Sequence, residues 1–189
     1  MPLPIGHGLA GIAFFQARPG LFLTKKWLDA LFLVFLSNLP DADFLPGLMT
    51  GSPNRYHHGI FHSLGAALVV SAVIVLIFFR KKQQPKILFA VSFLVYSSHL
   101  LLDFFTRDFA APYGLPLFWP FSKSYYIAAR PIFSNITRSS RSSDFFPSLF
   151  NSHNLKAALL EIVLIGGLVL MATMVRFLLT KGNPRSNPG

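Results

Sequence analysis

Long apolar blocks with few charged residues recur along the chain, and their lengths predict membrane crossings. Residues 87–106 form a block of 20 positions that would be about 30 Å long as an α-helix, the thickness of a bilayer core. Residues 63–79 and 157–175 form two further blocks of similar length, and Glu161 is the only charged residue within the second. These three blocks predict three membrane-spanning helices.

Two shorter apolar blocks precede them. Residues 5–17 and 27–40 contain only 13 and 14 positions, which is short for a membrane span. Pro19 and Gly20 lie between them and favour a turn, so we expect a short helical hairpin that packs against the longer helices at reduced membrane depth. The fold class predicted is all-α: a polytopic membrane bundle of about five segments, made of this hairpin and three longer crossings.

Composition supports the same class. Hydrophobic residues make up 52% of the chain and charged residues 13%, whereas a soluble globular protein has about 25% charged residues. A chain of 189 residues suffices for one domain, which we expect to span 1–189, with a long outer loop at 107–154 and a disordered tail at 182–189. Cysteine is absent, which excludes disulfides, thiolate metal ligands and a cysteine nucleophile.

The positive charges predict an orientation in the membrane. The net charge of +10 could indicate nucleic-acid binding, but in a membrane protein topology and anionic lipid explain it better, and we expect no nucleic-acid partner. Ten of the 17 basic residues flank the apolar blocks on one side: Arg18, Lys25, Lys26, Arg80, Lys81, Lys82, Lys86, Arg176, Lys181 and Arg185. Because cytoplasmic ends are enriched in Lys and Arg, this places the N-terminus outside and the C-terminus inside.

Under this topology, nine ionisable residues fall at the outer ends of their segments. Each alone could be a helix cap, a turn residue or an interfacial side chain. Together they converge from four segments, and ionisable groups at membrane depth tend to pair or to bind an ion. They are His7, Asp41, Asp43, His57, His58, His62, His99, Asp103 and His153.

The spacing of these residues favours a metal site. His99 and Asp103 are four positions apart, so on a helix both project from one face. Asp41 and Asp43 are two apart and would face the same way in an extended turn. The sequence has no HExxH motif, so a zincin protease is not supported.

A second cluster of imidazoles follows. His58 and His62 are also four apart. His57 and His62 are five apart and can meet only if a turn intervenes, which Gly59 permits.

Five short segments carry a resemblance to a known family: GH at 6–7, LPDADF at 39–44, HHGIFHS at 57–63, SHLLLD at 98–103 and YGLPLFWPFS at 113–122. In this order, over residues 4 to about 126, the chain resembles the YdjM-like family of membrane-bound, metal-dependent hydrolases, also called LexA-binding inner-membrane proteins. The resemblance implies a plasma-membrane location. It also implies, by analogy, a loose kinship with zinc-dependent phospholipase C, whose helical sites bind several zinc ions through His and Asp.

The resemblance also bears on individual roles. The family pattern usually reads HRG followed by HS, and here His58 stands at the Arg position, which leaves His57 and His62 as the matching pair. The resemblance therefore implies that His58 contacts a metal-binding side chain or a phosphate group and does not itself bind metal. The seven candidate metal ligands are His7, Asp41, Asp43, His57, His62, His99 and Asp103.

These residues predict a hydrolase. Seven ligands exceed what one tetrahedral zinc needs, so we expect two or more divalent ions, with zinc favoured. A phosphoester suits such a site, its location suggests a lipid or small-molecule substrate, and four cationic candidates could hold the substrate: Arg55, His58, Arg107 and Lys123. The expected catalytic residues are Asp41, Asp43, His58 and Glu161.

Two alternatives remain open. A metal or proton transporter also needs intramembrane His and Asp, but it would place polar residues at several depths. The second alternative is that the protein is a non-catalytic binding partner in the membrane. For Glu161 we expect His153 or His7 as the partner, against a simple packing role, and we expect Asp29 and Asp144 to be ordinary charges.

Overall fold

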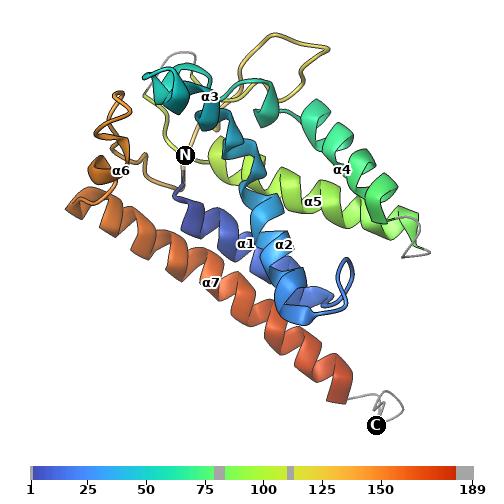
Figure 1. Ribbon diagram of the computed structural model, residues 1–189. Coiled ribbons are helices and arrows are strands. Elements are labelled where there is room, and N and C mark those ends of the chain that lie inside the picture. The colour runs from blue at the N-terminus through green and yellow to red at the C-terminus, as the bar shows by residue number, and fades with distance from the viewer. Residues whose placement is uncertain (1, 79–83, 110–112, 182–189) are drawn as a thin grey trace.

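The described part of the molecule is helical, with two isolated β-bridges and no longer strand. The computed structural model describes residues 2–78, 84–109 and 113–181 (Figure 1), so the tail expected at 182–189 lies outside the described residues. The elements are α1 (Pro4–Ala17), α2 (Lys26–Asn38), η1 (Leu39–Asp43), α3 (Phe44–Met49), η2 (Pro53–Arg55), η3 (Ile60–His62), α4 (Leu64–Phe78), α5 (Pro85–Phe104), α6 (Phe145–Ser148) and α7 (Ser152–Lys181).

Helices α1 and α2 form the hairpin that the two short apolar blocks predict. Gly11 lies where they pack, and a Cβ there would be 2.6 Å from the carbonyl oxygen of Leu33, so only glycine allows this approach. Asp29 fixes the turn: its buried carboxylate accepts hydrogen bonds from the backbone N–H groups of four consecutive residues, 20–23, at 2.7–3.2 Å. The expectation that Asp29 is an ordinary charge is therefore wrong.

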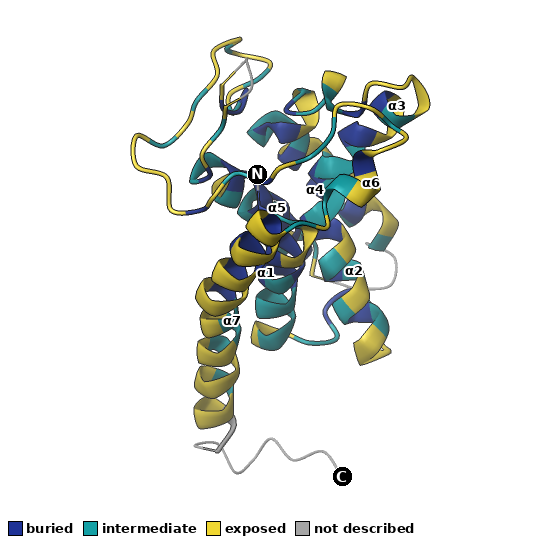
Figure 2. Ribbon diagram, turned by 90° about the vertical axis from the view of Figure 1, so that its left-hand side faces the viewer, coloured by how far each residue is buried: buried dark blue, intermediate teal, exposed yellow. Residues whose placement is uncertain are grey.

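Helices α5 and α7 are the two that are long and apolar enough to cross a membrane within the described residues. Helix α7 extends beyond the block at 157–175 in both directions, and most of its side chains are exposed (Figure 2), as expected for a surface that faces lipid. Helix α4 is equally apolar but has only 15 residues. Two crossings are therefore supported directly.

The helices share two distinct ends (Figure 1). At one end, the Arg18 guanidinium at the end of α1 donates a hydrogen bond of 2.7 Å to Gln84, which precedes α5. The N-terminus of α1, the C-terminus of α5 and the N-terminus of α7 meet at the opposite end. The segment after α5 covers that end, where Thr106 and Phe133 form one of the two β-bridges. The basic helix ends and the segments with His and Asp are thus separated by the length of the bundle.

The main apolar core lies between α1, α2, α4 and α5. Tyr96 of α5 is fully buried there, and its hydroxyl donates a 2.7 Å hydrogen bond to the carbonyl oxygen of Phe61 in η3. This contact fastens η3 to α5, directly beside His62 and His99. The core therefore sets the distance between the two segments that contribute most of the candidate ligands.

Candidate metal centre

Five segments bring eight of the sequence-derived candidates together at the covered end of the bundle. We call this group the His/Asp cluster: His7 of α1, Asp41 and Asp43 of η1, His57 and His58 of the turn after η2, His62 of η3, and His99 and Asp103 of α5. The side chains of His7, His62 and His99 are fully buried.

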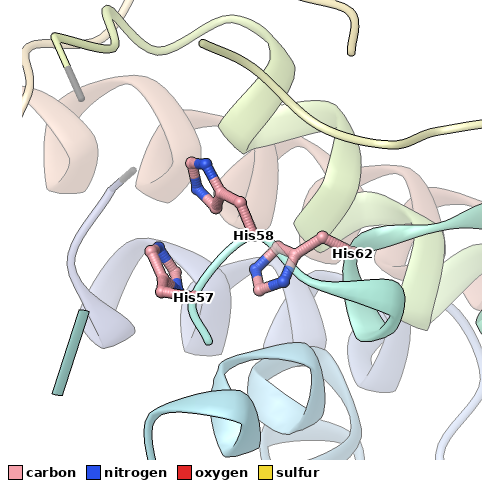
Figure 3. Close-up of side chains that lie close together, drawn as sticks. All are labelled: His57, His58 and His62. Carbon is pink, nitrogen blue, oxygen red and sulfur yellow. The ribbon is translucent and has the colours of Figure 1, made fainter. Parts of the chain in front are cut away.

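Two local conformations differ from expectation. Asp41 and Asp43 belong to a 3-10 helix instead of an extended turn. The turn that lets His57 and His62 meet uses a left-handed backbone at His58, with φ of 59°, whereas Gly59 has φ of −77°. Figure 3 shows the three imidazoles that this turn gathers.

Three atoms form a group, which we call the cage, of the size that one metal ion requires, and an oxygen of Asp41 lies beside two of them. His62 Nε2 and His99 Nε2 are 3.3 Å apart, and Asp103 Oδ2 lies 3.4 Å and 3.2 Å from them, respectively. Asp41 Oδ1 lies 3.7 Å and 3.6 Å from the same two nitrogens. Ligands about 2.0–2.1 Å from a tetrahedral zinc are about 3.3 Å from one another, so these spacings fit a single ion.

The nitrogens on the far side of these rings face acceptors. His99 Nδ1 donates a hydrogen bond of 2.8 Å to the carbonyl oxygen of Ser37. His62 Nδ1 is 2.9 Å from Asp43 Oδ2, and His57 Nδ1 is 3.1 Å from Asp43 Oδ1. A proton held on Nδ1 leaves the Nε2 lone pair free for a metal. Asp43 thus faces the backs of two imidazoles, whereas the sequence grouped it with the direct ligands.

A second group of donors lies beside the cage. The His7 ring stacks on that of His99, and His7 Nε2 is 3.6 Å from Asp103 Oδ1, the carboxylate oxygen that is not part of the cage. Within the described residues, several buried atoms of the cluster have no hydrogen-bond partner: both His7 nitrogens, both oxygens of Asp41 and of Asp103, Nε2 of His57 and His58, and Nδ1 of His62, whose 2.9 Å contact with Asp43 is an ion-pair contact. Since buried polar atoms are rarely left unpaired, this pattern fits a site that binds ions.

The electrostatics favour the metal-binding forms of two side chains. Burial lowers the pKa of His57 well below its ordinary value, and neighbouring imidazoles and Arg138 lower it further, so the ring is neutral. Burial alone would raise the pKa of Asp41, but the imidazoles of His99 and His62 hold it below its ordinary value. For His62, burial lowers the pKa, but the carboxylates of Asp103 and Asp41 raise it well above its ordinary value, so a proton competes with a metal there.

The structure adds a cation that sequence spacing could not indicate. Arg138 Nε donates a 2.7 Å hydrogen bond to Asn54, and its guanidinium lies 5.1 Å from the ring centroid of Phe44. Phe44 in turn stacks on His57 at 4.0 Å. Arg138 has no ion pair with a carboxylate among the described residues. The sequence suggested Arg55, Arg107 and Lys123 as substrate-holding cations, and all three are exposed.

Glu161 and His153 lie outside the cluster. Both carboxylate oxygens of the buried Glu161 accept the N–H of Leu3, at 2.9 Å and 3.1 Å, in front of α1. The exposed His153 donates a hydrogen bond of 2.7 Å from Nε2 to the carbonyl oxygen of Asn135. The expected pairing of Glu161 with His153 or His7 is therefore wrong, since its partner is a backbone amide that a sequence pattern cannot reveal.

Comparison with known proteins identifies the family. The chain belongs to the YdjM inner membrane protein family, which it matches over residues 1–179. No curated protein and no solved structure matches it significantly. The family and the two candidate spanning helices together make this a membrane protein.

Proposed function

We propose that this member of the YdjM inner membrane protein family is a metal-dependent hydrolase that cleaves a phosphoester. The observation that carries the proposal is the cage of His62 Nε2, His99 Nε2 and Asp103 Oδ2, whose mutual spacings fit one ion, with Asp41 Oδ1 within 3.7 Å of both nitrogens. Mixed imidazole and carboxylate ligands suit zinc. A purely structural metal site would use all of its donors on one ion. Here further buried donor atoms remain beside the cage, which favours a catalytic site.

The remaining donors support a second ion. His7 Nε2 and Oδ1 of Asp103, which lie 3.6 Å apart, are the atoms that would hold it. Bound ions of this kind supply activation of water and neutralise the charge that develops on a phosphoester. The protein's own contribution is to hold the imidazoles through Asp43 and Ser37 and to exclude bulk water by burial.

Arg138 supports an anionic substrate. Its charge lies next to the Phe44–His57 stack, and its Nε donates a hydrogen bond to the neutral side chain of Asn54. A guanidinium with unpaired N–H donors is suited to a phosphate group. The membrane location favours a lipid phosphoester, and a small soluble phosphoester is the other form of the same chemistry. We keep Asp41 and Asp43 as proposed catalytic residues, whereas the hydrogen bonds of Glu161 with the backbone of Leu3 favour a packing role for it.

The proposed placement has the cluster at the extracytoplasmic face. Its support is that the basic residues Arg18, Lys86 and Arg176 lie at the far ends of α1, α5 and α7 from the cluster. Five membrane segments would result if α4 and the α1–α2 hairpin also enter the bilayer.

A transporter is less well supported than a hydrolase. Outside the cluster, the buried acidic and basic side chains in the described part of the chain are Asp29 and Glu161. Both accept hydrogen bonds from backbone N–H groups, Asp29 from residues 20–23 and Glu161 from Leu3. Two carboxylates held by the backbone do not form a path of ionisable residues through the membrane.

The test of the proposed function combines metal analysis with an assay. Detergent-purified full-length protein should contain two zinc ions per chain and hydrolyse bis(p-nitrophenyl) phosphate, and His99→Ala should reduce both. Asp144→Ala is the matched control, because Asp144 is exposed and lies outside the cluster. Metal content with no hydrolysis of phosphodiesters or phosphomonoesters would reject the activity, and metal content below one ion per chain would reject the site.

A further inference from the structure

His58 has a backbone conformation that requires an explanation. Its φ of 59° makes it the one non-glycine residue with positive φ among the described residues, and the other such positions are Gly20, Gly51 and Gly114. The left-handed region is unfavourable for residues with a Cβ, and such positions concentrate at functional sites. Glycine follows directly at position 59, yet the left-handed residue is the histidine. The imidazole is therefore held here at a cost in backbone energy.

The contacts of that imidazole point to a metal. It is buried next to the rings of His57 and His62, with ring centroids 4.1 Å and 5.1 Å away (Figure 3). Its Nε2 is 3.9 Å from Asp103 Oδ2 and has no hydrogen-bond partner among the described residues. Buried ring nitrogens normally have a hydrogen-bond partner, and no protein group among the described residues provides one here. A metal ion bound between this nitrogen and the carboxylate would satisfy both.

Asp108 explains the orientation of the ring. Its Oδ2 lies 3.4 Å from His58 Nδ1 and also accepts the N–H of Gly114 at 3.0 Å. The loop thus fixes the carboxylate, and the carboxylate favours the proton on Nδ1. In this tautomer the lone pair of Nε2 faces the His/Asp cluster, as in carboxylate–histidine–metal arrangements.

We propose that His58 is a metal ligand through Nε2 and that Asp108 is its positioning residue. This inference rests on the proposed metal-dependent function. The Nε2 atom of His58 faces Asp103 Oδ2, the oxygen that belongs to the cage, so the ion concerned is the one held by His62, His99 and Asp103, and bonds of about 2.0–2.2 Å to each atom can span the 3.9 Å separation. The resemblance implied a phosphate contact for His58. The structure argues against it, because carboxylates flank both ring nitrogens and would repel a phosphate.

The test measures zinc binding by the full-length chain in detergent. Zinc per chain is determined by mass spectrometry after dialysis, and affinity by competition with a chromophoric chelator. His58→Ala should retain about one ion fewer than the parent. Asp108→Ala should keep the parent stoichiometry with at least tenfold weaker affinity for one ion, the usual effect of losing a carboxylate that orients a ligand. His153→Ala and Asp144→Ala are matched controls at exposed positions and should equal the parent.

The outcomes separate this inference from the proposed function. If the parent binds two ions and His58→Ala binds the same two with the same affinity, His58 is not a ligand and the hydrolase proposal stands. If His58→Ala keeps its metal but loses inhibition by inorganic phosphate, the phosphate contact is correct and the inference is overturned. If His58→Ala does not fold, Asp108→Ala decides, and parent-like affinity in that variant overturns the inference. A parent without metal would overturn both.

Discussion

The imidazole of His7 stacks on that of His99, with ring centroids 3.6 Å apart and ring planes at 17°. His7 lies in the second turn of α1 and His99 in the last third of α5, so the stack joins the beginning of the chain to its central helix. Both rings reach toward Asp103, His7 toward one carboxylate oxygen and His99 toward the other. Asp103 is therefore the residue on which both proposed ions depend.

Replacing Asp103 should consequently affect the cluster more than replacing any one histidine. We expect Asp103→Ala to lose both ions and to lower the melting temperature in zinc, with a much smaller difference from the parent in the presence of a chelator. Ligand binding at 100 times the Kd contributes about 2.7 kcal/mol of stability, which the variant would lack. Zinc analysis and thermal unfolding with and without EDTA test this. An equal loss of stability in both conditions would assign Asp103 to packing alone.

Asp29 should matter for stability and not for metal. Four backbone N–H groups donate to its buried carboxylate, and Asp29→Ala removes the acceptor that they share, at a cost of about 2–4 kcal/mol. Unfolding should therefore occur at a lower temperature while zinc per folded chain is unchanged. Asp144→Ala, at an exposed position, provides the comparison. A variant of Asp29 as stable as that control would show that the turn does not need the carboxylate.

Arg138 should act on substrate binding. We expect Arg138→Ala to raise KM for an anionic phosphoester at least tenfold, about 1.4 kcal/mol, with zinc content preserved. Arg138→Lys should recover only part of this, because an ammonium cannot reproduce the planar donors of a guanidinium. Arg141→Ala removes an exposed charge from the same loop and should have little effect. If all three variants had the KM of the parent, Arg138 would not contribute to substrate binding.

For Glu161 the sequence and the structure make different predictions. A catalytic role predicts that Glu161→Gln lowers activity at least tenfold with metal content preserved. The hydrogen bonds with Leu3 predict that the glutamine, which keeps one acceptor oxygen, is tolerated within about twofold. We expect the second result. Kinetics on any phosphoester that the parent cleaves, together with zinc analysis, distinguish the two.

The orientation in the membrane is open to a labelling test. Cys introduced at the exposed Ser140 should react with an impermeant thiol reagent from the extracytoplasmic side, and a reporter after Gly189 should be cytoplasmic. The absence of native cysteine makes the labelling specific. Reaction only after the membrane is opened would place the cluster on the cytoplasmic side.

The helices were predictable from the sequence because lipid-facing and core-facing positions are both apolar and leave long uninterrupted blocks. The ends were less predictable: α7 continues through Ser152 and Lys156, polar residues that periodicity assigns to a loop. Helix α4 begins at Leu64, one residue inside its apolar block, because Ser63 is extended and ends the preceding 3-10 turn.

The ionisable candidates were predictable because His and Asp are rare in apolar segments, and eight of the nine outer ones gather in the structure. The direction in which each side chain points was not predictable from the sequence. Asp43 faces the Nδ1 atoms of two rings, and the left-handed turn is at His58 because tertiary contacts, not local glycine preference, determine it. Asp108 and Arg138 belong to a loop whose position relative to the cluster follows from long-range contacts.

The hydrogen bond from Leu3 to Glu161 also bears on how the protein is made. Its two partners are separated by 158 positions, and α1, which contributes His7, packs extensively on α7. A ribosome delivers α1 early and α7 late, so α1 lacks this partner until nearly the whole chain has been synthesised. Contacts of such high sequence separation form slowly, because the intervening chain must be ordered first. All residues of the His/Asp cluster precede α7, so the candidate ligands are synthesised first and the packing of α7 on α1 is the last step to complete the fold around them.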